Sequence, residues 1–90
     1  MTGVEIAVLC LLVRQDEALY ASELMHKSGG ILTRPATYVL LNRMCAQGLI
    51  DKHFDNATDR FNSERPFYVI TAKGKLKLLD FLQKLDLFYA

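Results

Sequence analysis

The chain has 90 residues, of which 51% are hydrophobic and 23% charged, and its formal net charge is +1. This length and composition predict one domain with a packed core, which excludes a disordered protein and a uniformly cationic DNA-coating protein. Because a small domain has little interior, the high apolar content also indicates an interface between subunits.

The first predicted element is a helix over residues 2–14, whose apolar positions run round most of its circumference. Such a helix is expected to be buried on all sides. Its apolar stretch, residues 4–13, is interrupted only by Glu5 and is much shorter than the about 20 residues that cross a bilayer. A signal peptide would require a cationic segment before this stretch, and the sequence has none there. We therefore expect a cytoplasmic protein without a membrane segment.

A second, short helix and a glycine turn follow. The helix is predicted over about residues 22–27 and ends at residues 28–30, Ser-Gly-Gly, because glycine tolerates the left-handed conformation found there. Ile31 and Leu32 are expected to fill the turn with buried side chains.

A third helix is predicted from residue 34 to about residue 47, capped by Thr33 and closed by Gly48. Pro35 fits its first turn, where the N–H that proline lacks has no helical partner in any case. On a helical wheel one arc is expected to face the core, and it consists of Thr37, Leu40, Leu41 and Met44. The opposite arc consists of Pro35, Tyr38, Val39, Asn42, Arg43 and Ala46.

A β-hairpin and a last helix complete the chain. Residues 49–54 and 67–70 favour strands, the polar segment 55–65 is predicted to be a long hairpin loop, and a helix runs to about residue 88. The predicted order α-α-α-β-β-α is that of a winged helix-turn-helix, a mainly α fold with a small β-hairpin (α+β). We expect a single winged-helix domain over residues 1–90, with the helix-turn-helix at about 20–48, the wing at about 49–71 and a C-terminal dimerisation helix at about 74–89.

Three stretches of the sequence carry a family pattern. Residues 32–44 and the Gly-Leu-Ile at 48–50 combine a threonine cap, a tyrosine and spaced apolar residues, and residues 68–74 read Tyr-Val-Ile-Thr-Ala-Lys-Gly. Residues 19–24 are a looser match. Together they resemble PadR-like transcriptional regulators, here in a short form with a reduced C-terminal region. The resemblance implies that the third helix enters the major groove of DNA, which supports Arg34, Tyr38 and Arg43 as contacts.

Positive charge collects on the segments that a winged helix lays against a duplex. Residues 24–54 and 66–77 each carry +3, whereas residues 1–23 carry −3 and residues 55–65 and 78–90 carry −1 each. Cations in such places release counterions from phosphates, so the small net charge does not exclude DNA as a partner.

The candidate DNA-binding residues are Thr33, Arg34, Tyr38, Asn42, Arg43, Arg60 and Lys73. Arg43 and Asn42 suit guanine and adenine edges respectively, whereas Thr33 and Arg34 suit a phosphate at the helix start. Tyr38 offers a hydroxyl to phosphate or a ring that packs on the hairpin. Arg43 is alternatively a salt-bridge residue. Arg60, in the acidic hairpin loop, is a candidate for a minor groove.

The last helix has an apolar stripe that covers about half of its circumference, wider than the about 100° of a helix packed on one core. Together with the apolar first helix, this predicts a homodimer in which both terminal helices pack against a second copy. The expected interface residues are Ile6, Leu9, Val13, Leu78, Leu82, Leu85 and Phe88. Two third helices would then enter successive major grooves about 34 Å apart, in an inverted repeat.

These features predict a sequence-specific regulator of transcription, a repressor that binds double-stranded DNA as a homodimer with helix 33–47 in the major groove. The alternative is a winged-helix protein-interaction module, or a replication or partition module of a mobile element, favoured by the low net charge and the acidic loop.

The sequence lacks the patterns of a catalytic or metal-binding protein. It has no Gly-rich phosphate loop, no paired carboxylates on one face and no Cys/His/Asp cluster, so we expect no enzyme activity, no cofactor and no metal. The two cysteines, Cys10 and Cys45, are expected to be reduced core thiols. A small-molecule effector at the dimer interface is an open possibility.

Overall fold

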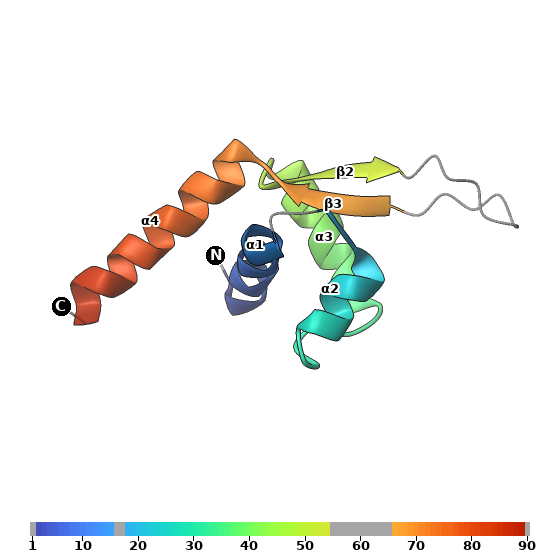
Figure 1. Ribbon diagram of the computed structural model, residues 1–90, viewed down its shortest axis with the longest axis horizontal. Helices are drawn as coiled ribbons and strands as arrows, with labels where there is room; N and C mark the ends of the chain where they lie inside the picture. The colour runs from blue at the N-terminus through green and yellow to red at the C-terminus, as the bar shows by residue number, and fades with distance from the viewer. Residues whose placement is uncertain (1, 16–17, 55–65, 90) are drawn as a thin grey trace, which may run out of the picture.

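The computed structural model describes residues 2–15, 18–54 and 66–89. The predicted minor-groove residue Arg60 lies outside these ranges. The elements run in the order α1 (Gly3–Gln15), β1 (Leu19–Tyr20), α2 (Ala21–Lys27), α3 (Ala36–Ala46), β2 (Ile50–Phe54), β3 (Pro66–Ile70) and α4 (Ala72–Tyr89) (Figure 1). The expected α+β winged-helix architecture is confirmed, with one strand more than predicted.

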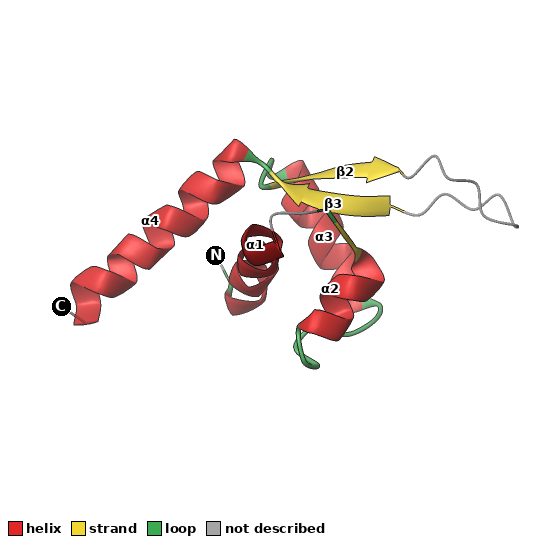
Figure 2. Cartoon of the chain, in the orientation of Figure 1, coloured by secondary structure: helices red, strands yellow, loops and turns green. Residues whose placement is uncertain are grey.

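The additional strand, β1, completes a three-stranded antiparallel sheet of order β1-β3-β2. Leu19 lies opposite Tyr68 on one side of β3, and on the other side the β2–β3 hairpin runs from Ile50 opposite Ile70 to Phe54 opposite Pro66. The hairpin lies across one end of the helices (Figure 2). The sequence did not predict β1, because two residues are too few for an alternating pattern to be recognised.

The core lies where α1, α2 and α3 meet the sheet. Its most deeply buried apolar side chains come from the helices and the sheet and are at most 1% exposed. They are Val8, Leu9, Leu12, Leu24, Leu41, Met44, Ile50 and Tyr68. The arc predicted to face the core on α3 is confirmed, since Thr37, Leu40, Leu41 and Met44 are all buried.

The turn between α2 and α3 forms at the predicted glycines. Gly29 and Gly30 have φ angles of 65° and 97°, in the region that favours glycine. The Ser28 hydroxyl accepts the backbone N–H of Leu32 at 3.0 Å and so closes the turn. Leu32 is buried as expected, but Ile31 is 60% exposed, so only one of the two apolar side chains fills the turn.

The helix α3 begins at Ala36, two residues later than predicted, and its N-cap residue, Pro35, makes no side-chain hydrogen bond to the helix. The Arg34–Pro35 peptide bond is cis. Arg34 lies in the turn before the helix. Thr33 contributes its backbone carbonyl, which accepts the Thr37 N–H at 2.9 Å, rather than the expected hydroxyl cap.

The prediction that α1 is buried on all sides is wrong for the single chain. One face packs into the core, but Val4 and Val13, on the two opposite flanks of that face, are 37% and 42% exposed. The helix α4 packs against α1 near its start and then extends away from the other helices (Figure 1). Among the side chains of α4 that the structure describes, the exposed large apolar ones are Leu76, Leu79, Leu82 and Leu85. None of the described helices is long and apolar enough to cross a membrane.

Candidate nucleic-acid interface

The side of α3 that faces away from the core carries three of the seven predicted DNA contacts, Tyr38, Asn42 and Arg43. Tyr38 is 42% exposed and Asn42 is also exposed, one helical turn further on. Thr33 and Arg34, just before the helix, are exposed as well. The centre of this side is apolar, because Val39 is 68% exposed. The exposed side of α3 therefore offers hydrogen-bonding groups around one aliphatic side chain.

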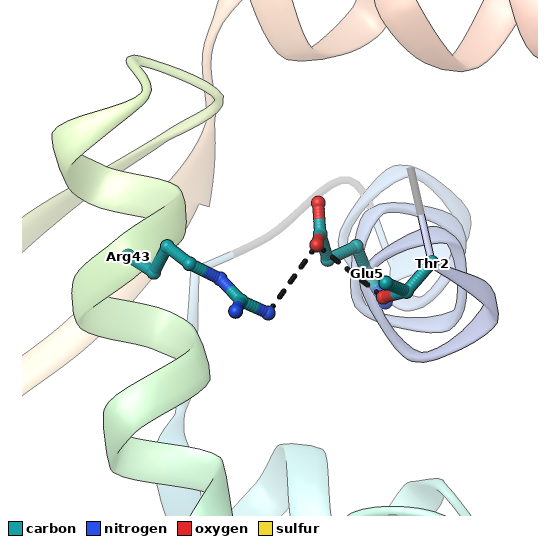
Figure 3. A network of polar contacts seen from close by, with 3 residues as sticks. All are labelled: Thr2, Glu5 and Arg43. Atoms are coloured by element: carbon teal, nitrogen blue, oxygen red, sulfur yellow. Dashed lines mark hydrogen bonds and ion pairs between the residues drawn. The ribbon is translucent and has the colours of Figure 1, made fainter.

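Arg43 is exposed but bound to a residue of α1. Its Nη2 lies 3.4 Å from the Glu5 Oε1, and the two side chains are 54% and 7% exposed. The same carboxylate oxygen accepts the Thr2 hydroxyl at 3.3 Å, and the Thr2 Oγ1 accepts the Glu5 backbone N–H at 3.3 Å (Figure 3). The salt bridge considered as the alternative role of Arg43 is thus present, and it joins α3 to the N-terminus of α1.

Sequence reasoning missed Glu5 as a member of this interface. Two signals pointed to it. Glu5 is the one charged residue in the apolar stretch 4–13, and Thr2 precedes it at the spacing of a capping box. Neither signal identifies Arg43 as the partner, because 38 residues separate the two.

Lys73 lies at the other end of α3. Its Nζ donates a hydrogen bond of 2.7 Å to the backbone carbonyl oxygen of Gln47, the C-cap of the helix. A cation at this position satisfies a free carbonyl and interacts favourably with the helix dipole. Lys73 therefore ties the start of α4 to the end of α3, while its side chain remains exposed.

An open apolar groove of about 470 Å³ runs beside α3. It lies between the N-terminus of α1, the turn before α3 and one edge of α3 itself. Its lining residues are Thr2, Val4, Ile31, Leu32, Thr33, Ala36, Thr37, Val39, Leu40 and Arg43. The groove thus borders the same helix as the candidate DNA contacts.

Two ionisable groups have raised pKa values, Cys45 on α3 itself and Tyr68 on β3. Burial raises the pKa of the Cys45 thiol, with Asp51 adding to this effect and Lys52 opposing it. Burial also raises the pKa of the Tyr68 phenol, and the neighbouring Cys45 and Tyr38 add to it. Both groups are therefore protonated at neutral pH. Within the described ranges, no three His, Cys, Asp or Glu side chains are placed to hold a metal ion.

No protein-family model matches the chain, and no curated protein matches its sequence. Solved structures do match. A PadR-like regulator from Bacillus cereus is 25% identical, with a TM-score of 0.70 over 94% of this chain and 82% of that one. A PadR family regulator from Clostridium difficile is 21% identical, with a TM-score of 0.76 over 98% and 92%. Bacillus subtilis PadR, solved with operator DNA, is 21% identical, with a TM-score of 0.74 over 90% and 47%.

The chain has the PadR-like winged-helix fold. This confirms the resemblance found in the sequence, and the structure explains two of the motifs that carry it. The Thr71 hydroxyl lies 2.6 Å from the Gly48 carbonyl oxygen and accepts the Gly74 N–H at 3.0 Å. The Thr71 backbone N–H donates to the Leu49 carbonyl at 3.1 Å. The Gly-Leu-Ile after α3 and the Thr-Ala-Lys-Gly after β3 thus bind each other in this PadR-like fold.

Three of the residues expected at a dimer interface are exposed on the PadR-like fold. Val13 is 42% exposed on α1, and Leu82 and Leu85 are 46% and 38% exposed on α4. A second open groove, of about 380 Å³, lies between these helices. It is lined by Val13, Ile70, Lys75, Leu78, Leu79 and Leu82.

The other predicted interface residues are less available. Leu9 is completely buried and Leu78 is 6% exposed, because the inner faces of α1 and α4 pack on the core of the same chain. Leu9 therefore has no free surface for a second copy, which corrects the prediction for this residue, and Leu78 offers only the small part that lines the groove. Ile6 is half-buried, and the side chain of Phe88 lies outside the described ones.

Proposed function

We propose that the protein is a sequence-specific DNA-binding transcriptional regulator, a cytoplasmic repressor that binds an inverted repeat as a homodimer. The exposed surface formed by α3 and the turn before it carries this proposal, because its exposed side chains include Arg34, Tyr38, Asn42 and Arg43. The likeness to the Bacillus subtilis PadR that was solved with operator DNA supports it. In this proposal residues 1–90 act as one domain, with residues 33–47 in the major groove.

Each side chain has a role that its chemistry allows. Asn42 reads an adenine edge and Arg43 a guanine edge, because their side chains can pair with these bases through two hydrogen bonds. Tyr38, Thr33 and Arg34 bind phosphates at the start of α3. We also propose Lys73 as a phosphate contact and Arg60 as a minor-groove contact.

The test is selection of duplexes from a random pool, followed by binding measurements on variants. Asn42→Ala is expected to lose about tenfold discrimination at one base pair. Arg34→Ala is expected to weaken binding to all duplexes equally. It should also reduce the slope of log affinity against log salt by about one, because one phosphate contact is lost. The matched control Lys84→Ala removes a cation from α4, where Lys84 pairs with Asp80, and should leave binding unchanged. A pool without an enriched sequence would contradict the proposal.

The proposed homodimer uses the exposed apolar side chains of α1 and α4. Val13, Leu79 and Leu82 line one groove, and Leu76 and Leu85 extend the apolar surface along α4. Exposed leucines along one helix are unfavourable in water unless a partner covers them. A second copy presents the same two helices, so a two-fold arrangement covers both sets at once.

Leu82→Glu is expected to convert a dimer into a monomer, because each interface would contain two buried carboxylates without partners. Light scattering at micromolar concentration should give twice the 10.2 kDa chain mass for the wild type and the single mass for the variant. Gln83→Glu introduces the same charge on an adjacent exposed position of α4 and should remain dimeric. A monomeric wild type would exclude the dimer.

A second candidate function is a protein-interaction module. The groove beside α3 favours it, because Ile31 and Val39 are 60% and 68% exposed there and the lining is largely apolar. The duplex selection discriminates between the two candidates. A DNA-binding protein enriches one sequence, and enrichment should fail when Asn42 and Arg34 are both changed to Ala.

A further inference from the structure

We infer that Glu5 is a positioning residue for Arg43, which it holds through one amino group so that Arg43 meets a base edge from a fixed direction. This inference rests on the proposed function, and it assigns to α1 a part in sequence recognition. Glu5 is buried on α1, so its effect on recognition is exerted through Arg43.

The first step is the burial of the Glu5 carboxylate. Its side chain is 7% exposed, and among the described residues Arg43 is the cation in ion-pair contact with it. Glu5 also lines a hollow with Lys73 and Lys77, and of these two lysines Lys73 is bound through its Nζ to the Gln47 carbonyl oxygen. A largely buried carboxylate is stabilised by a cation beside it. Arg43 is therefore expected to remain on Glu5 when α3 meets its target.

The second step concerns the N–H donors of Arg43 that the contact with Glu5 does not use. The contact with Glu5 uses Nη2, and the side chain is still 54% exposed. A guanidinium is planar and has donors on several edges, so one edge can be held while another faces a base. Without Glu5, the flexible side chain would have to be ordered at the moment of binding, which lowers discrimination.

The third step is the support of Glu5 itself. The Thr2 hydroxyl donates to the Glu5 Oε1 and accepts the Glu5 N–H, both at 3.3 Å, so the carboxylate is oriented at the start of α1 (Figure 3). A carboxylate at a helix N-terminus also interacts favourably with the helix dipole. Glu5 thus has a fixed position from which to orient Arg43.

The experiment uses the full chain, the duplex that the wild type selects from a random pool, and its single-base-pair variants. The base pair read by Arg43 is the one at which Arg43→Ala loses discrimination. Glu5→Gln is expected to lose about fivefold discrimination at this same base pair. Its affinity for random-sequence duplex should be unchanged or higher, because a negative charge has been removed. The double variant with Glu5→Gln and Arg43→Ala should discriminate at this base pair as well as Arg43→Ala alone does.

The controls separate positioning from folding and from charge. Asp80→Asn makes the same change of charge on α4 and should keep full discrimination. If the role of Glu5 were purely structural, Glu5→Gln would weaken binding to all duplexes by the same factor, and that result would overturn the inference. If Glu5→Gln does not fold, Glu5→Asp keeps the charge but shortens the side chain, and it should give a smaller loss at the same base pair. Full discrimination in Glu5→Asp would then count against positioning.

The failure of this inference is distinguishable from the failure of the proposed function. If the wild type selects a duplex and Arg43→Ala keeps full discrimination at every base pair, the positioning role is overturned and the proposal of DNA binding is unaffected. A wild type that selects no duplex overturns both.

Discussion

Gly74→Ala is expected to lower the free energy of unfolding by about 3 kcal/mol, because the close packing at this position has no room for a methyl group. A Cβ added at Gly74 would overlap with the backbone carbonyl oxygen of Leu49 and would lie 2.9 Å from the Cγ1 of Ile70. The backbone of Leu49 cannot retreat, since it also accepts the Thr71 N–H. Urea denaturation followed by circular dichroism measures the loss.

Gly3→Ala is the matched control for this substitution. A Cβ at Gly3 meets nothing within 4 Å, and the residue begins α1. Alanine restricts the unfolded chain more than glycine does, so this variant should be neutral or more stable by about 0.5 kcal/mol. Equal losses for the two substitutions would show that Gly74 has no special packing role.

Tyr68→Ala is expected to lower the free energy of unfolding by about 4 kcal/mol, whereas Tyr68→Phe is expected to raise it by about 1 kcal/mol or leave it unchanged. The ring is completely buried in the core. In the part of the chain that the structure describes, the Tyr68 hydroxyl oxygen is buried and has no hydrogen-bond partner. Removing it therefore relieves a desolvation penalty, and removing the ring leaves a cavity.

The same residue predicts how stability responds to alkaline pH. Burial raises the pKa of the Tyr68 phenol above its ordinary value of 10.0, so the folded state holds this proton more tightly than the unfolded state. The contribution of Tyr68 is fully present below pH 10 and is lost as the pH rises towards its folded pKa. Denaturation at a series of pH values should show a smaller alkaline loss for Tyr68→Phe than for the wild type. Equal losses would contradict the assignment to Tyr68.

The features that could be predicted from the sequence are local ones. The buried arc of α3 follows from the spacing of Thr37, Leu40, Leu41 and Met44, because a helix repeats every 3.6 residues. The turn after α2 follows from Gly29 and Gly30. In each case the residues that determine the structure lie close together in the sequence.

The features that could not be predicted depend on contacts between distant residues. The strand β1 forms because Leu19 pairs with Tyr68, and Arg43 is held because Glu5 lies across from it in the fold. Leu9 and Leu78 looked like interface residues because apolarity alone does not distinguish the core of one chain from the contact between two. Ile31 and Leu32 are equally apolar neighbours, and only the path of the turn decides which one is buried.

The contacts around Thr71 have a consequence for the length of the spacer between two half-sites. Thr71 and Lys73 bind the end of α3 at Gly48 and Gln47, and α4 begins at Ala72. The direction of α4 is therefore coupled to that of α3. In the proposed dimer, a change in the angle between the two α4 helices would alter the separation of the half-sites, while the bases read within each half-site would stay the same.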